Sequence, residues 1–380
     1  MTLLIEDTAR NVLASWGGAA VAAGLATGAV ISPFSTPRQH AGYKQSAQET
    51  VDRLKAEGAE VWFDPETHAL QMPAVGDFRY YDDWPLWDGP RGQLTSHAEM
   101  RGHVERVFGE QDGLGVPHLA PTVLLHSAQS PASRQALDLA RVAVEVDSAC
   151  RLAIAGDSAF WSSGLTLDAH VGGLAQLEGG GWWLTVVRNF NVLPVPAMPE
   201  EVHGVCRTVR AFSEDGTVHV SHGDLAGLPA IAASATTLGT GWDPRQRVSC
   251  YGSYEARAPG DGGQWFSQAT LEGLLSLMSR ADASLLEQRD PTLSNRLLPG
   301  TVPPGANEAF IHHVDVLSRV VADLRGRAHR DAYQALADRY NAAQADWLSV
   351  AAAIGSRSRA DTWISPLHDG LHRYGQTEGF

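Results

Sequence analysis

Short apolar runs alternate with helix-like segments over the first two thirds of the chain. Mostly apolar runs, three to six residues long, occupy 2–6, 29–31, 60–63, 122–126, 151–155, 182–187, 217–221 and 236–239. Between most of them lie segments with apolar residues at helical spacing, such as 45–57, 131–146, 165–177 and 199–212. Short apolar strands joined by helices are typical of a parallel sheet that helices cover.

Eight such strands in this order predict a (β/α)8 barrel, an α/β fold, over residues 1–255. The usual size of this fold is about 250 residues. The first strand is the weakest, and if 2–6 only leads into the barrel, residues 248–251 supply the eighth strand. An open, doubly wound sheet has the same alternation and is the alternative.

Two regions depart from the alternation. Residues 69–118 predict an insertion with an aromatic and acidic stretch at 78–87 and a helix near 96–108. Insertions of this length serve as lids or interaction loops, and packing over a barrel edge is an equal alternative. Beyond a linker at 256–263, residues 264–380 predict a C-terminal helical extension, with helices near 268–288, 306–325 and 329–353.

Composition narrows the classes of partner. The formal net charge of −14 argues against charge-driven binding of nucleic acid, unless a partner subunit carries it. The three cysteines, Cys150, Cys206 and Cys250, are far apart, which suits a reducing cytoplasm and excludes a CxxC metal or redox site. We therefore expect a cytoplasmic protein with a small-molecule substrate, no membrane partner and an oligomeric state left open. The sequence identifies no cofactor and no bound metal.

Candidate functional groups are sought where the predicted strands end, because (β/α)8 barrels carry their active sites there. The candidate catalytic residues are Asp64, Asp157, Arg188, His222 and Asp224. Asp64 and Asp157 suit an acid and base pair, or the binding of a divalent cation together with His126 or His222. The alternative for each carboxylate is capping of a helix or turn, and for Arg188 a buried salt bridge to Asp157.

The candidate substrate-binding residues lie at the same strand ends. They are Ser35, Arg38, His68, His126, Asn189, Gly223, Gly239, Thr240, Gly241 and Trp242. Glu66 is a further polar residue behind the third strand. Trp161 and Trp242 follow strand ends and suit stacking on a planar ring or a sugar.

Residues 217–243 combine His222-Gly-Asp224 behind the seventh strand with Gly239-Thr-Gly241 behind the eighth. This stretch resembles the phosphate-binding turn pair of many (β/α)8 enzymes, and the resemblance implies an anion held by backbone N–H groups. It departs from that pattern in Asp224, which would repel an anion, and in the short spacing between the turns. Residues 58–68 are loosely similar to the second-strand region of tRNA-guanine transglycosylases, although the zinc-ligand cysteines of that family are missing.

These patterns favour an enzyme that acts on a small polar or phosphorylated molecule, nucleotide-like or sugar-like. Its chemistry would be carboxylate acid/base or metal-assisted. Two alternatives stay open: a non-catalytic barrel that serves as a binding or assembly subunit, and a base-modifying enzyme of the transglycosylase type.

Overall fold

The computed structural model describes residues 3–8, 11–72, 74–76, 78–189, 193, 196–255, 268–355 and 361–380. Eight parallel strands form one curled sheet in the order β3-β2-β1-β8-β7-β6-β5-β4. They are β1 (Leu3–Ile5), β2 (Gly28–Ile31), β3 (Glu60–Phe63), β4 (Leu124–Leu125), β5 (Leu152–Asp157), β6 (Trp182–Arg188), β7 (Val218–Ser221) and β8 (Thr237–Thr240). β1 pairs with both β2 and β8, so the first and last strands meet as a barrel requires.

The predicted (β/α)8 barrel is therefore confirmed, including its first strand. Each strand lies beside its neighbours in sequence, without the reversal of strand order that defines a doubly wound sheet. The alternative eighth strand is the short β9 (Ser249–Cys250), which pairs with the end of β6 instead.

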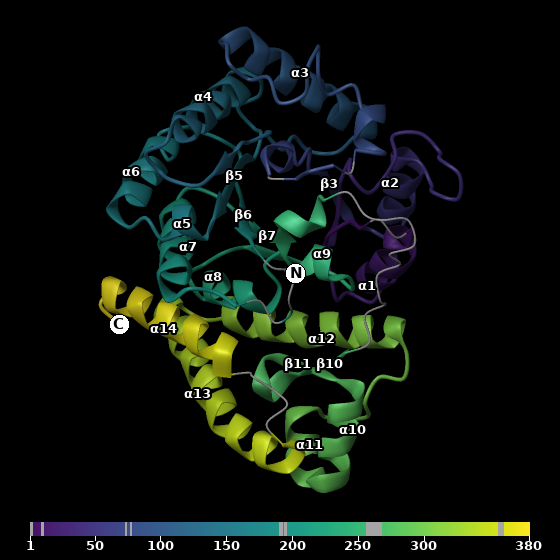
Figure 1. Cartoon of the computed structure of the whole chain (residues 1–380), viewed down its shortest axis with the longest axis vertical. Coiled ribbons are helices and arrows are strands. Elements are labelled where there is room, and N and C mark those ends of the chain that lie inside the picture. Colours follow the sequence, from purple (N-terminus) through teal and green to yellow (C-terminus); the bar gives the residue numbers. More distant parts are fainter. Residues whose placement is uncertain are drawn as a thin grey trace.

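Helices surround the strands (Figure 1). They are α1 (Gly18–Ala22), which a π-helical turn (Leu13–Gly17) precedes, α2 (Ala47–Ala56), α4 (Pro131–Val146), α5 (Ser158–Trp161), α6 (Leu165–Leu174), α7 (Pro199–Phe212), α8 (Leu228–Ala232) and α9 (Pro244–Arg247). Local sequence fixes their starts: Ser46 and Glu49 form a capping box on α2, and Pro131 and Pro199 occupy first turns, where proline fits. Within the described residues, no helix has the length and apolar character needed to cross a bilayer.

The insertion covers the seam between the edge strands β3 and β4. It contains 3-10 turns at Thr67–Gln71 and Tyr81–Asp83 and the helix α3 (His97–Leu114). From α3, the fully buried Gln111 donates its amide N–H groups to the carbonyls of Phe63 and Leu119, at 2.9 and 3.0 Å. One side chain thus links the end of β3 to the segment before β4 by donating to a backbone carbonyl of each.

The inside of the barrel changes from apolar to polar along its axis. Strand alternation gives one interior layer of large apolar side chains, formed by Leu4, Val30, Trp62 and Trp183. Two residues further along the same strands lie Glu6, Ser32, Asp64 and Thr185, all buried. The barrel therefore ends, at the carboxyl ends of its strands, in a layer of polar side chains.

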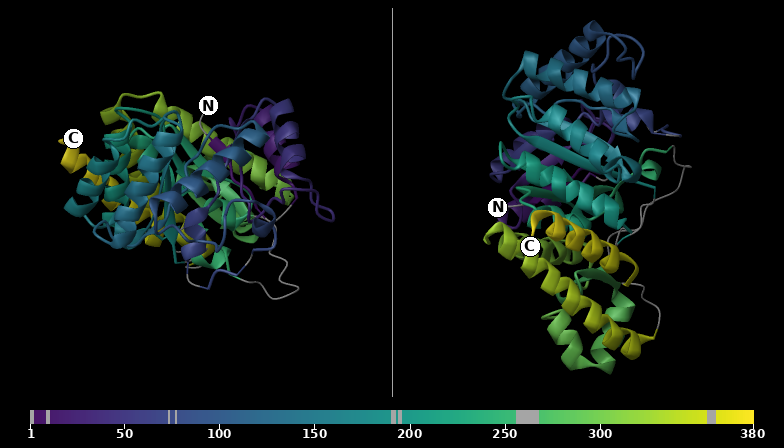
Figure 2. Two further views of the ribbon diagram at one scale, coloured as in Figure 1. Left: turned by 90° about the horizontal axis from the view of Figure 1, so that it is seen from above. Right: turned by 90° about the vertical axis from the view of Figure 1, so that its left-hand side faces the viewer.

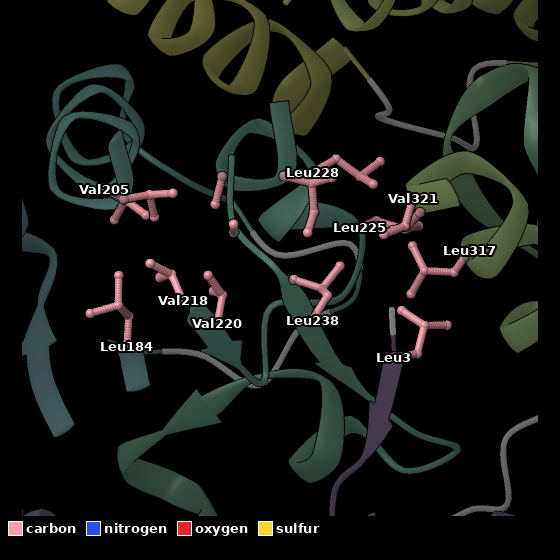
Figure 3. Packing of buried hydrophobic residues seen from close by; sticks show 14 of the residues in the cluster. Leu3, Leu184, Val205, Val218, Val220, Leu225, Leu228, Leu238, Leu317 and Val321 are labelled. Atoms are coloured by element: carbon pink, nitrogen blue, oxygen red, sulfur yellow. The ribbon is translucent and has the colours of Figure 1, made fainter. Parts of the chain in front are cut away.

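The C-terminal region lies against one side of the barrel (Figures 1 and 2). It contains α10 (Arg280–Arg289), α11 (Pro291–Leu297), α12 (Ala306–Arg325), α13 (His329–Ile354) and α14 (Asp361–Glu378). α12 and α8 pack together, and Leu317 and Val321 of α12 lie near Leu225, Leu228 and Leu238 in one apolar cluster (Figure 3).

The predicted helix at 268–288 is wrong in its first half. Residues Gln268–Leu271 and Ser276–Ser279 form the antiparallel hairpin β10-β11, and only α10 is helical. The turn places Leu275 at φ 46°, a left-handed conformation that a helix cannot contain. α11 and α14 are additional helices that the sequence pattern did not predict, and the predicted linker at 256–263 lies outside the described residues.

Candidate functional site

Acidic residues from two strand ends gather in the polar layer of the barrel. Glu6 follows β1, Asp64 follows β3, and Glu66 lies two residues further on. Their exposed fractions are only 2%, 8% and 6%. Because the carboxyl ends of parallel strands meet at one end of a barrel, residues far apart in sequence form one buried acidic cluster.

Glu66 is held by groups from three other segments. Its carboxyl accepts hydrogen bonds from the Ser32 hydroxyl and from the Tyr254 hydroxyl, the latter at 3.0 Å. The Nε2 atom of His222 lies 4.0 Å from Glu66 Oε1. The backbone N–H of Glu66 donates to Asp64 Oδ1 at 2.8 Å.

Glu66 and His222 both have left-handed backbone conformations, with φ of 45° and 51°. Such a conformation costs a non-glycine residue of order 1–3 kcal/mol, and in folded proteins it concentrates at active sites and ligand clamps. Two strained residues from opposite parts of the sequence thus face each other at the barrel end. This pairing points to a functional site at Glu66 and His222.

The surroundings shift the pKa values of the acidic groups in different directions. Burial, together with the negative charge of Asp64, raises the pKa of Glu66 well above its ordinary value. Burial also raises the pKa values of Asp7 and Asp64 to about 6. Burial acts on Glu6 as well, but the neighbouring His222 and His219 outweigh it and lower the pKa of Glu6.

A small cavity opens beside Glu66. It measures about 30 Å³, room for about two water molecules. It is lined by Asp7, Ser32, Phe34, Ser35, Glu66, His222, Arg245, Ser253 and Tyr254. His222 Nδ1 is buried there and makes no hydrogen bond within the described part of the chain. His68 Nε2 is likewise buried without such a partner, and burial lowers the pKa of His68 to about 3, so this imidazole is neutral.

Asp224 and Thr240 belong to a structural network, contrary to the predicted catalytic and substrate-binding roles. Asp224 is 3% exposed and accepts two hydrogen bonds from Arg247, one of 2.9 Å. Thr240 Oγ1 lies 3.2 Å from Asp224 and 3.1 Å from Nε2 of the fully buried His313 on α12. This network joins the barrel end to the C-terminal helices.

Backbone N–H groups beside both of the expected phosphate turns are occupied by internal side chains. Gln246 Oε1 accepts the N–H groups of Trp242 and Asp243, at 2.8 and 2.7 Å. Glu6 Oε1 accepts the N–H of His222 at 3.1 Å. These side chains would compete with an anion, and the phosphate turns stay a prediction.

The three glycines of these turns are explained by close packing. A Cβ atom on Gly239 would lie 2.0 Å from Glu6 Oε1, and one on Gly241 would lie 2.4 Å from the Cδ of Gln246. A Cβ on Gly223 would lie 2.3 Å from the Leu238 side chain. These contacts require glycine without any ligand.

Three further predicted residues also have structural partners. Trp242 is fully buried and packs edge-on against Phe310, with ring centroids 5.3 Å apart, so the predicted stacking on a substrate ring is wrong. The equally buried Trp161 donates its indole N–H to Gly156 at 2.8 Å. Arg38 forms a surface ion pair of 2.7 Å with Glu110.

The remaining predicted residues gather at the ends of β5 and β6. His126 Nδ1 and Asp157 Oδ2 are 2.6 Å apart, and Asp157 also caps α5 through the N–H of Phe160. Arg188 pairs with the buried Glu201 at 2.5 Å, so the predicted alternative of a salt bridge to Asp157 is wrong. Asp157, Arg188 and Asn189 border a cleft of about 470 Å³.

Comparisons with known proteins add little to this geometry. No family model matches the chain, and no curated protein matches it. Among solved structures, a GH10 xylanase of Thermobacillus composti is similar at 15% identity and a TM-score of 0.34, over 58% of this chain and 67% of that one. A psychrophilic glycoside hydrolase family 10 endo-beta-1,4-xylanase is similar at 12% identity and a TM-score of 0.37, over 66% and 84%. Likeness at this level carries no information about activity.

The described residues contain no group of three or more His, Cys, Asp or Glu side chains that could hold a metal ion. Within the barrel, the structure brings together the predicted Asp64 and His222, with Ser35 on the wall of the cavity. Glu6, Asp7 and Tyr254 are members of the site that the sequence did not single out. Glu6 and Asp7 lie directly behind an apolar run, which is the feature of the sequence that could have identified them. That run gives the weakest sequence signal of the eight strands.

Proposed function

We propose that the polar end of the barrel is an active site for acid–base catalysis on a small, neutral polar molecule. One observation carries this proposal. A carboxyl group with a raised pKa, Glu66, and a carboxylate with a lowered pKa, Glu6, lie on either side of His222. Carboxyl groups whose surroundings push their pKa values apart are the usual mark of an acid and its complementary base.

The two groups suit different parts of one reaction. The raised pKa of Glu66 favours its protonated form, which can donate its proton to an oxygen or nitrogen atom that leaves the substrate. Glu6 stays ionised and so can stabilise positive charge that develops on the substrate. His222 lies between them and can position a substrate hydroxyl or amine, because its Nδ1 makes no hydrogen bond among the described residues.

The charge of the site favours a neutral substrate over a phosphorylated one. Four carboxyl groups surround the polar layer and its cavity: Glu6, Asp7, Asp64 and Glu66. The cations described beside them are Lys44 and Arg245. A phosphate would add negative charge to this cluster, so the sugar-like or nucleoside-like form of the hypothesis is favoured.

Substrate turnover by Glu66→Gln tests the proposal. Neutral chromogenic glycosides and nucleosides serve as probes of the wild-type protein. We expect turnover of at least one probe and a loss of about 10²–10⁴-fold in Glu66→Gln, the usual contribution of a general acid. Glu287→Gln, a charge-matched change of an exposed residue on α10, should leave turnover unchanged. Equal activity of Glu66→Gln and wild type contradicts the role of Glu66, and no turnover of any probe contradicts the substrate class.

A further inference from the structure

The largest described hollow at the carboxyl end of the barrel is the cleft beside β5 and β6. Its volume of about 470 Å³ is within the range of small-molecule sites, roughly 300–1,000 Å³, whereas the cavity beside Glu66 measures about 30 Å³. Its lining includes Asp157, Ala159, Ser162, Arg188 and Met198. The cleft therefore has room for a ring system, whereas the cavity beside Glu66 does not.

One side of the cleft presents hydrogen-bonding groups without a net positive charge. The Asp157 side chain is 19% exposed, and its Oδ2 atom is oriented by His126 at 2.6 Å. Ser162 Oγ is buried and has no hydrogen-bond partner in the described part of the chain. The Arg188 guanidinium is neutralised by Glu201, whose side chain is only 2% exposed. This edge suits N–H and O–H donors of a neutral ligand, and it does not suit a phosphate.

The apolar part of the lining contains a thioether instead of an aromatic ring. It consists of Val187, Pro196, Ala197 and Met198. Met198 is 51% exposed, and its sulfur accepts a hydrogen bond of 3.3 Å from the Ser158 hydroxyl, which orients it. Methionine sulfur makes favourable contacts with aromatic rings. A flat heteroaromatic ring with N–H donors along one edge suits both the polar and the apolar groups of the lining.

One turn contacts both this cleft and the acid–base site. The 3-10 turn Tyr251–Ser253 is followed directly by Tyr254. The Tyr251 hydroxyl reaches Asp157 Oδ2 at 3.5 Å, and the Tyr254 hydroxyl reaches Glu66 Oε1 at 3.0 Å. The N–H of Tyr254 donates to the carbonyl of Tyr251 at 3.1 Å, and such turns hold their end Cα atoms within about 7 Å. The cleft and the acidic cluster therefore each contact one tyrosine of the same turn.

We propose that the cleft binds the nucleobase of a nucleoside-class substrate. Asp157 and Ser162 meet the polar edge of the base, and Met198 packs on its face. The inference rests on the proposed function, because it names the class of substrate presented to Glu66. Its test is a binding measurement and needs no turnover.

Isothermal titration of the full chain with adenosine, guanosine, cytidine and uridine tests the inference, with a neutral disaccharide as the competing class. We expect at least one nucleoside to bind. Ala159→Trp, which fills the cleft from an exposed position, should weaken binding at least tenfold, and Met198→Ala severalfold. Ala56→Trp, an equally exposed change on α2, is the matched control and should bind as the wild type does.

The outcomes separate this inference from the proposed function. Glu66→Gln should bind the nucleoside within about twofold of wild type, whether or not it turns over a substrate. Binding of the disaccharide alone, no binding of any nucleoside, or full binding by both Ala159→Trp and Met198→Ala would each overturn the nucleobase site. If Ala159→Trp blocks binding while Glu66→Gln turns over normally, the cleft stands and the catalytic proposal fails.

Discussion

The buried ion pair between Asp224 and Arg247 connects the barrel end to the C-terminal helices. The two residues are 3% and 1% exposed, and two hydrogen bonds join them. His313 of α12 lies 3.5 Å from the same carboxylate and also bonds Thr270 of the hairpin at 2.9 Å. Asp224→Asn keeps the shape of the side chain and removes the charge that faces the guanidinium.

This substitution should lower the free energy of unfolding by about 3–5 kcal/mol, because it leaves a buried cation without its counter-charge. The chain offers a matched control in Arg296 and Asp346, which also form two hydrogen bonds, of 2.7 and 2.8 Å. There the arginine is 59% exposed. Water can replace the lost carboxylate at that site, so Asp346→Asn should cost about 0–1 kcal/mol.

Urea unfolding followed by tryptophan fluorescence measures both effects. The double variant Asp224→Asn, Arg247→Met should recover part of the lost free energy of unfolding, because neither charge of this ion pair is then buried. Burial alone would raise the pKa of Asp224, but Arg247 and His313 outweigh this effect and hold the pKa below its ordinary value. Its stabilisation is therefore present above about pH 4 and declines as the pH falls below that value. Equal midpoints for Asp224→Asn and Asp346→Asn, or a gap that widens in acid, would refute this reasoning.

Three further changes test the polar layer and the turns, each by denaturant unfolding. Glu66→Gln should gain stability over wild type as the pH rises above about 5, by up to about 1.4 kcal/mol per unit, because residue 66 then ionises in the unfolded wild type while burial opposes its ionisation in the folded protein. Gly239→Ala should lower the free energy of unfolding by about 1–3 kcal/mol, because its Cβ would clash with Glu6. The control Gly102→Ala, in open space within α3, should raise the free energy of unfolding by about 0.5–1 kcal/mol. Gln246→Ala should cost about 1–3 kcal/mol for each backbone N–H it leaves unpaired.

The barrel was predictable because its strands are short, apolar and separated by amphipathic helices. Those features are local, so a window of a few residues contains them. The closure of the β3-β4 seam was not predictable, because it depends on Gln111, whose amide meets carbonyls 48 and 8 residues away. The β10-β11 hairpin was not predicted, because each of its strands has only four residues and the helix α10 begins directly after β11.

The site was predictable only in part. Asp64 and His222 follow well-defined strands, so the rule that barrel sites lie at strand ends selected them. Glu6 follows β1, whose three residues gave the weakest strand signal. Tyr254 comes from beyond the eighth strand and reaches Glu66 across 188 residues of sequence. A rule that reads strand ends cannot select such a residue.

At the turn pair of residues 217–243, internal side chains compete with the anion that the local resemblance suggests. Glycine turns with exposed N–H groups bind an anion only if nothing in the protein already accepts those bonds. Here Gln246 accepts two of them, and Glu6 accepts the N–H of His222 from 216 residues away. Glu6 brings a negative charge to the position a phosphate would need, and its carboxylate is kept ionised by the neighbouring histidines. The carboxylate that competes with a phosphate at this turn is therefore the same one that the acid–base proposal uses as the ionised partner of Glu66, so both arguments depend on the position of Glu6.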